Sequence, residues 1–123
     1  GPYQCQAAIA ALHARAPDHG STDWKQIAGL YRILRDHEPS PVVALNHAVA
    51  VGMAEGAAKG LDEFAMLATE PSMTSYPYFF AARGQLHARN GSLEAARTDL
   101  TRAIELAPNE AERQRLTEER DAL

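Results

Sequence analysis

The side chains in this 123-residue chain that could support metal chemistry are five histidines and one cysteine. A zinc site needs such residues at short, fixed spacings, as in H-E-x-x-H, C-x-x-C or H-x3-H. The spacings found here match none of these patterns; the residues are Cys5, His13, His19, His37, His47 and His87. We therefore expect neither metal ligands nor a cofactor.

Nucleophilic catalysis has equally little support in the sequence. Cys5 lies in an Ala-rich helical segment without a nearby histidine, so we expect a buried, inert thiol. No G-x-S-x-G, P-loop or dinucleotide-binding glycine pattern occurs. The carboxylate pairs 62–63 and 118–119 are adjacent in the chain, so the two members of each pair point to different helix faces. The sequence predicts no catalytic residues and no enzyme.

The composition is that of an ordinary globular protein with a single domain over residues 1–123. Its net charge of −4 gives no electrostatic footprint for nucleic acid. The lone cysteine excludes an internal disulfide and suits a reducing cytoplasm, where we expect the protein to reside. No apolar run approaches the roughly 20 residues of a membrane-spanning helix. The abrupt helical start indicates an excised domain, and Gly1–Pro2 is compatible with natural sequence or a cleavage remnant.

The apolar periodicity predicts about seven helices and no strands. Their expected ranges are about 3–15, 23–38, 41–56, 58–69, 77–90, 93–106 and 109–123. Ser40 is expected to cap the third helix, with Pro41 at its first position. Gly91 suits a left-handed helix end, and Asn109 with Glu112 three residues later predicts a capping box.

Two turn glycines, Gly56 and Gly91, lie 35 residues apart in similar patterns. Residues 80–109 resemble a tetratricopeptide repeat (TPR), through Phe80, Gly84, Gly91, Ala96, Leu100, Ala103 and Pro108. The same spacing applied backwards selects Pro39, Leu45, Gly56, Leu61, Ala65 and Ala68. The resemblance implies an all-α, TPR-like α-solenoid with three helix hairpins (3–39, 40–75, 76–108) and a capping helix (109–123). His87 then takes an aromatic packing position.

The concave groove of such a solenoid is the candidate binding site. Counting from Leu45 and Phe80, its predicted lining is Val43, Asn46, Ala50, Met53, Tyr78, Ala81, Gln85 and Arg89. We expect Val43, Met53 and Tyr78 to hold a helix or an extended segment, with Asn46 and Gln85 orienting it. The alternative for Asn46 is a hydrogen bond between helices within the fold. Arg83 replaces an apolar core position, and we expect it to pair with a carboxylate such as Asp62 or Asp99.

Longer blocks suggest a narrower resemblance. They are P-Y-Q-C-Q-A-A-I-A-A-L-H-A from Pro2, D-W-K-Q-I-A-G-L-Y-R-I-L from Asp23, P-S-P-V-V-A-L-N-H-A-V-A-V from Pro39, and N-E-A-E-R from Asn109. In this order they resemble the C-terminal, TPR-like region of one group of extracytoplasmic-function (ECF) RNA polymerase sigma factors, over residues 3–113. Two positions depart from that pattern: Cys5 replaces a usual Leu, and His47 a common Arg.

The sigma-factor resemblance implies a regulatory role in transcription initiation. The partners it implies are the parent's own sigma regions or the RNA polymerase core, and this portion itself makes no contact with nucleic acid or membrane. The promoter-reading and core-binding regions of that family are not among these 123 residues. Two alternatives are a freestanding TPR scaffold for protein–protein interaction and a small-molecule sensor with its ligand in the groove or near Trp24.

Overall fold

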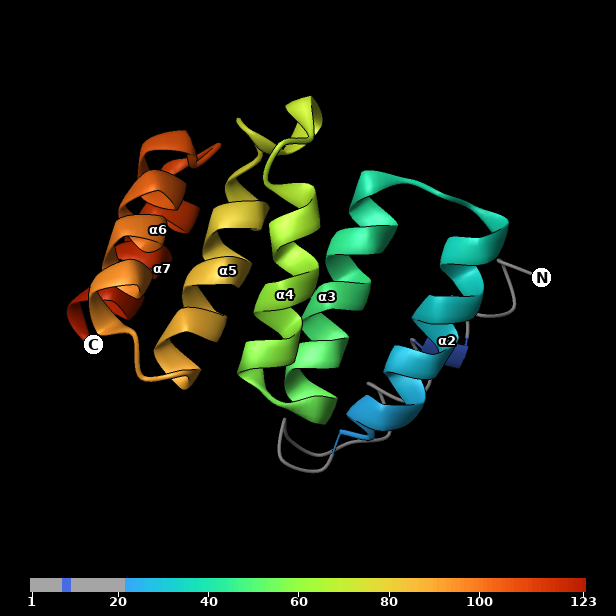
Figure 1. Ribbon diagram of the computed structural model, residues 1–123. Coiled ribbons are helices and arrows are strands. Elements are labelled where there is room, and N and C mark those ends of the chain that lie inside the picture. Colours follow the sequence, from blue (N-terminus) through green and yellow to red (C-terminus); the bar gives the residue numbers. More distant parts are fainter. Residues whose placement is uncertain (1–7, 10–21) are drawn as a thin grey trace.

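A computed structural model describes residues 8–9 and 22–123 of the chain. Within these ranges the structure is entirely helical, and Figure 1 shows the helices side by side in chain order. They are α2 (Trp24–His37), α3 (Pro41–Glu55), α4 (Ala57–Leu67), a 3-10 turn η2 (Pro71–Met73), α5 (Pro77–Arg89), α6 (Leu93–Leu106) and α7 (Glu110–Asp121). The expected helix at 3–15 lies outside the described residues except for positions 8–9, which are helical. No helix in the described part is long and apolar enough to cross a membrane.

Local sequence signals set the helix ends as predicted. The Ser40 hydroxyl accepts a hydrogen bond from the Val43 amide (3.2 Å), and the Asn109 side chain accepts one from the Glu112 amide (2.9 Å). Gly91 has φ of +81°, a value that favours glycine because it has no Cβ. These three residues satisfy or redirect backbone groups that the helix itself leaves unpaired.

The core is divided along the solenoid rather than gathered in one centre. One cluster joins α3, α4 and α5 through Leu45, Phe64, Phe79 and Leu86, with Met73 of η2 closing its end. Separate clusters lie at α2–α3 and at α5–α6–α7. Each helix therefore depends mainly on its neighbours in the row, as in other repeat proteins.

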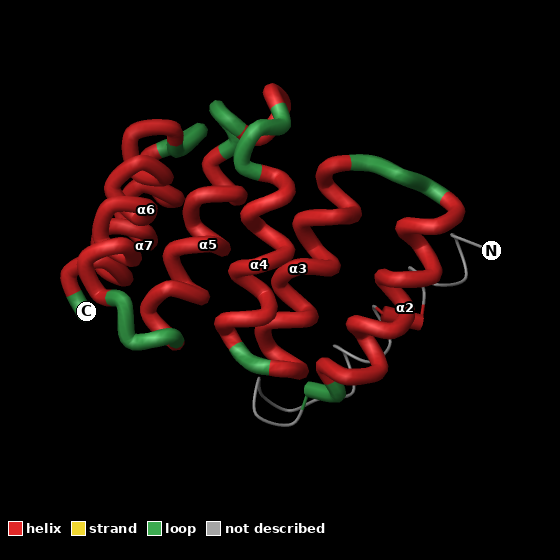
Figure 2. The backbone as a smooth tube through the Cα atoms, in the orientation of Figure 1, coloured by secondary structure: helices red, strands yellow, loops and turns green. Residues whose placement is uncertain are grey.

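The repeat period is 36 residues, one more than the glycine spacing predicts. The two first helices begin at Pro41 and Pro77, and the two second helices at Ala57 and Leu93. The glycine spacing is misleading because the two turns differ in length (Figure 2). Helix α3 continues to Glu55, and a single residue joins it to α4. Three residues separate α5 from α6.

The one-residue difference changes which side chains of α4 are buried. Gly60, Phe64 and Leu67 face the core, at the positions that Ala96, Leu100 and Ala103 occupy in α6. The predicted packing positions Leu61, Ala65 and Ala68 are wrong by one residue: Leu61 is only half-buried and both alanines are exposed. A shift of one residue rotates a side chain by about 100° around the helix axis, from the core to the surface.

The last helix covers the end of the final hairpin. Leu116 is the buried residue of α7, and it packs with Leu100 and Ala103 of α6. The outer faces of α7 carry ion pairs three or four residues apart, such as Arg115 with Glu112 and Glu119. A charged outer surface of this kind ends a solenoid without exposing its core.

Candidate functional site

The inner face of the superhelix contains a groove between α2, α3 and α5. Its cavity has a volume of about 300 Å³. The lining residues are Trp24, Tyr31, Asn46, Val49, Met53, Tyr78, Ala82, Gln85, Leu86 and Arg89. Five of the six residues predicted as binding residues are therefore brought together: Asn46, Met53, Tyr78, Gln85 and Arg89.

The sixth predicted binding residue, Val43, is not in the groove. It is buried against Leu34 between α2 and α3. Ala50, also expected to face the groove, is fully buried beside Ile27. Asn46 and Met53 of the same helix line the groove as predicted, so the two errors are confined to positions of α3 that pack against α2.

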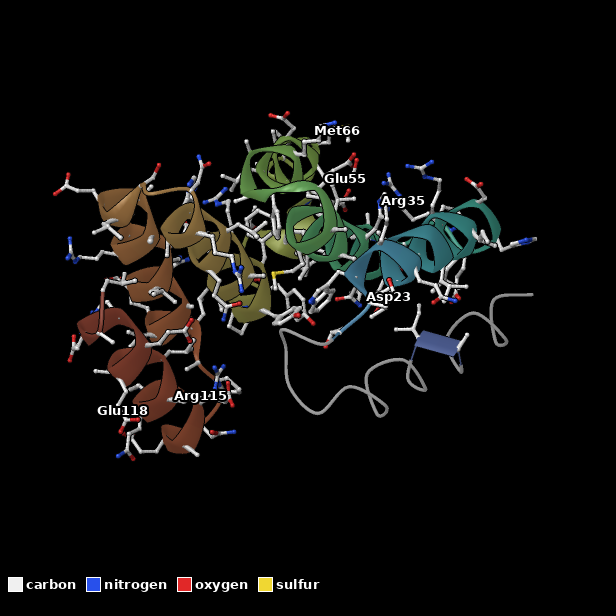
Figure 3. The ribbon with its side chains drawn as sticks, turned by 90° about the horizontal axis from the view of Figure 1, so that it is seen from below. Asp23, Arg35, Glu55, Met66, Arg115 and Glu118 are labelled. Atoms are coloured by element: carbon white, nitrogen blue, oxygen red, sulfur yellow. The ribbon has the colours of Figure 1, made fainter. Side chains whose placement is uncertain are left out.

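Ala81 is buried for a different reason, because α7 packs over it through Leu116. Ala81 also lines a second hollow of about 220 Å³ between α5 and α7, together with Pro77, Tyr78, Pro108, Glu112, Arg115 and Leu116. Tyr78 lines both cavities, so the two lie next to each other along the inner face. In Figure 3, Asp23 and Arg115 lie on this side of the row of helices, and Met66 and Glu55 lie on the other side.

Helix α2 supplies two groove residues that are not among the predicted lining residues, although the small-molecule alternative already places a ligand near Trp24. Trp24 and Tyr31 are seven residues apart, so they lie on one face of α2. Both are aromatic residues of the helix expected at about 23–38. The signal that could have found them is the presence of polar atoms on both rings, since Trp and Tyr prefer sites that are apolar at one end and wet at the other.

Three polar side chains of the groove have no partner within the described part of the fold. Asn46, Gln85 and Arg89 form no side-chain hydrogen bond or ion pair with any other described residue, so the predicted alternative of an interhelical Asn46 bond is not seen there. Among the described residues of the lining, Arg89 is the one that carries a charge. Burial raises the pKa of Tyr31 and Tyr78 above the ordinary value of 10, which keeps both phenols neutral and able to donate and accept hydrogen bonds.

A second polar site lies between α2, α3 and α4 on the outer face, where Figure 3 shows Arg35 turned away from Asp23. We call Arg35, His47 and Glu63 the outer cluster; they line a cavity of about 590 Å³. Arg35 Nη1 lies 2.9 Å from His47 Nδ1 and 3.4 Å from Glu63 Oε2. In the sequence, His47 stands out as one of five histidines and as a departure from a resemblance, and neither observation predicts this cluster.

The predicted ion pair of Arg83 forms with Asp99, and not with Asp62. Two hydrogen bonds of 2.8 Å join the guanidinium to both carboxylate oxygens of Asp99, which is 5% exposed. The guanidinium also lies 4.9 Å from the centre of the Phe79 ring. His87 packs half-buried beside this pair, with Nε2 3.8 Å from Asp99 Oδ2. The pair joins α5 to α6 and is internal to the fold.

No group of three or more potential metal ligands is present in residues 8–9 and 22–123. Cys5, His13 and His19 lie outside those ranges. What the described part offers is therefore a surface for binding: an open groove with aromatic, amide and cationic side chains.

Comparison with known proteins supports the fold. The chain is similar to the first TPR domain of human RPAP3, solved by NMR, with a TM-score of 0.71 and 22% identity over 99% of this chain and 91% of that one. The architecture is thus a TPR-like α-solenoid. No family model matches the chain.

A curated relative is much longer than this chain. The chain is 48% identical over 115 residues to the uncharacterized protein R00370 of Rhizobium meliloti (strain 1021). The match covers 91% of this chain but 26% of the relative, so the chain spans about a quarter of that protein's length.

Proposed function

We propose that this chain is a protein-interaction module that holds a segment of a partner protein in the inner groove. The observation that carries the proposal is the groove itself, where Asn46, Gln85 and Arg89 face an aromatic-lined cavity without partners among the described residues. Polar groups left free beside apolar surface are suited to orient a bound chain. Solenoids of this type usually act as scaffolds and not as enzymes.

The lining also indicates the chemistry of the partner. Tyr78 is 46% exposed and, with Met53 and Trp24, offers apolar contact area. The amides of Asn46 and Gln85 can pair with the backbone of an extended segment. Because Arg89 is the sole charge among the lining residues that the structure describes, we infer that the segment is largely apolar and carries a carboxylate that reaches Arg89.

The sequence blocks support a finer proposal, that the module belongs to an ECF sigma factor. The groove would then hold a segment of the parent's sigma regions or of the RNA polymerase core, and so would set how readily the promoter is engaged. The length of the rhizobial relative is compatible with this proposal, because most of that protein lies outside the match. Such a role would place the protein in the cytoplasm.

Groove binding can be tested with the full-length parent as ligand source. Arg89→Glu should weaken partner capture about tenfold, which corresponds to about 1.4 kcal/mol. Arg97→Glu is the matched control, since Arg97 is exposed on α6 and does not line the groove. Equal capture by both variants would contradict the groove proposal. Trp24 lines the cavity and is the sole tryptophan, so its fluorescence reports occupancy, including by a small molecule.

The sigma-factor proposal needs a separate experiment. Residues 1–123 are deleted from the parent protein, and transcription by reconstituted RNA polymerase is measured on its target promoters. We expect altered activity or altered promoter choice. If both are unchanged while Arg89→Glu still lowers capture of a partner, the chain is a protein-interaction scaffold outside transcription initiation. The sigma-factor proposal is then rejected, and the groove proposal stands.

A further inference from the structure

The outer cluster connects three helices through one buried histidine. His47 of α3 is 5% exposed and lies 2.9 Å, Nδ1 to Nη1, from Arg35 of α2. The same Nη1 atom lies 3.4 Å from Oε2 of Glu63 on α4. Arg35 therefore ties α2 to the two helices that follow it.

The chemistry of this contact defines the protonation state of His47. A guanidinium has only donors, so Nδ1 must accept the hydrogen bond. Nδ1 accepts only when the imidazole is neutral and carries its proton on Nε2. Nε2 is buried and has no hydrogen-bond partner within the described residues. A neutral ring is thus required for the hydrogen bond between Arg35 of α2 and His47 of α3.

Charged groups from all three helices surround His47. Burial lowers its pKa below the ordinary value of 6.5, and Arg35 lowers it further. Three further groups act on the pKa of His47 with decreasing effect: Glu63 raises the pKa, Arg32 lowers it and Glu55 raises it. An adjacent cavity of about 350 Å³ that His47 also lines is bordered in addition by Val51, Lys59 and Asp62.

We propose that the outer cluster is an acid-sensitive contact that releases the C-terminal half of α2 from α3 when His47 becomes protonated. An Nδ1–H group is a donor with a positive charge, so it cannot accept from Arg35 and repels it. Arg35 then keeps only Glu63 on α4. Tyr31 lies one turn before Arg35 and forms part of the α2 wall of the groove, so release of α2 changes the groove. The proposal concerns α2 itself and does not depend on what the groove binds.

Amide hydrogen exchange of the 123-residue chain between about pH 7.5 and pH 5 tests this proposal. After correction for the intrinsic exchange rate, opening of residues 31–37 in the wild type should rise by up to about tenfold per pH unit once His47 titrates. Amides of α5 and α6 should not follow. His47→Asn keeps an acceptor oxygen near the Nδ1 position but cannot titrate, so its α2 opening should stay flat. His37→Asn, which removes an exposed histidine of the same helix, should behave like the wild type.

Identical pH dependence in the wild type and His47→Asn would overturn the proposal. If His47→Asn does not fold, nitrogen-15 NMR of the wild-type histidines decides the matter. We expect His47 to be the Nε2–H tautomer at about pH 7.5 and to titrate together with the amide shifts of residues 31–37. An Nδ1–H tautomer, or a His47 that titrates without any change in α2, would refute it.

Discussion

Helices α3 and α4 approach each other through two glycines, and this contact gives a sharp test of the packing. A Cβ atom added to Gly60 would lie 2.6 Å from the Gly52 Cα and 2.9 Å from the Gly52 nitrogen. It would also lie 2.8 Å from Cδ1 of Leu86. The leucine can rotate, but the backbone of α3 can yield only if the two helices separate. Gly60→Ala should therefore destabilise the protein although alanine is the better helix former.

The size of the effect follows from two opposing terms. Replacing glycine by alanine inside a helix stabilises it by up to about 1 kcal/mol, whereas overpacking a close contact costs about 1–3 kcal/mol. We expect Gly60→Ala to lose about 1–2 kcal/mol of unfolding free energy. Gly29→Ala is the matched control, because Gly29 lies within α2 and no atom of the described residues outside its own helix backbone lies within 4 Å of an added Cβ. This control should gain about 0.5–1 kcal/mol.

Both variants are measured by thermal and urea unfolding followed by circular dichroism. For a domain of this size, 1 kcal/mol corresponds to a change in Tm of about 4 °C. We expect the Tm of Gly60→Ala to fall and that of Gly29→Ala to rise. If Gly60→Ala is as stable as the wild type while Gly29→Ala behaves as expected, the close approach of α3 to α4 is incorrect, and so is the 36-residue register.

Four other predictions follow from the charges and the packing. Asp99→Asn removes the charged acceptor of Arg83 and should lower the free energy of unfolding by about 2 kcal/mol in urea titrations; no change would mean that the pair is solvated. The pKa of His47 is lower in the folded chain, so the free energy of unfolding should be at its full value above about pH 6.5 and fall below that pH by at most about 1.4 kcal/mol per pH unit. Thermal melts at several pH values should show this loss in the wild type and not in His47→Asn. Ala103→Trp overpacks a position with 0% exposure and should lose at least about 1–3 kcal/mol; a wild-type melting curve would contradict the packing of α6. Arg89→Glu should leave the melting curve unchanged, within about 0.5 kcal/mol, while it weakens partner capture; a large loss of Tm would make Arg89 structural.

The groove shows how far counting along the sequence can go. In α5 the register was right, and Tyr78, Gln85 and Arg89 all line the cavity. In α3 the same counting placed Asn46 and Met53 in the groove correctly, but it also assigned Val43 to the groove although this residue is buried. Turn length decides the register, and a glycine marks a turn without showing how many residues the turn contains.

The ion pairs between side chains of different helices were harder to predict from the sequence. Arg83 at an apolar position indicated a buried ion pair and narrowed its partner to two carboxylates, because an isolated buried charge is unstable. The choice of Asp99 depends on the crossing of α5 and α6. The outer cluster had no sequence signal, since Arg35, His47 and Glu63 are 12 to 28 residues apart and belong to three different helices.

The sequence by itself determined the helices, most of their ends and the repeat architecture. Local rules are sufficient there: apolar periodicity, caps such as Ser40 and Asn109, and the left-handed Gly91 all act within a few residues. Only the tertiary structure decided which residues share the groove and which charged side chains form ion pairs with one another. Those relations depend on the rotation of one helix against the next, and a shift of one residue along a helix is enough to move a side chain from the surface to the core.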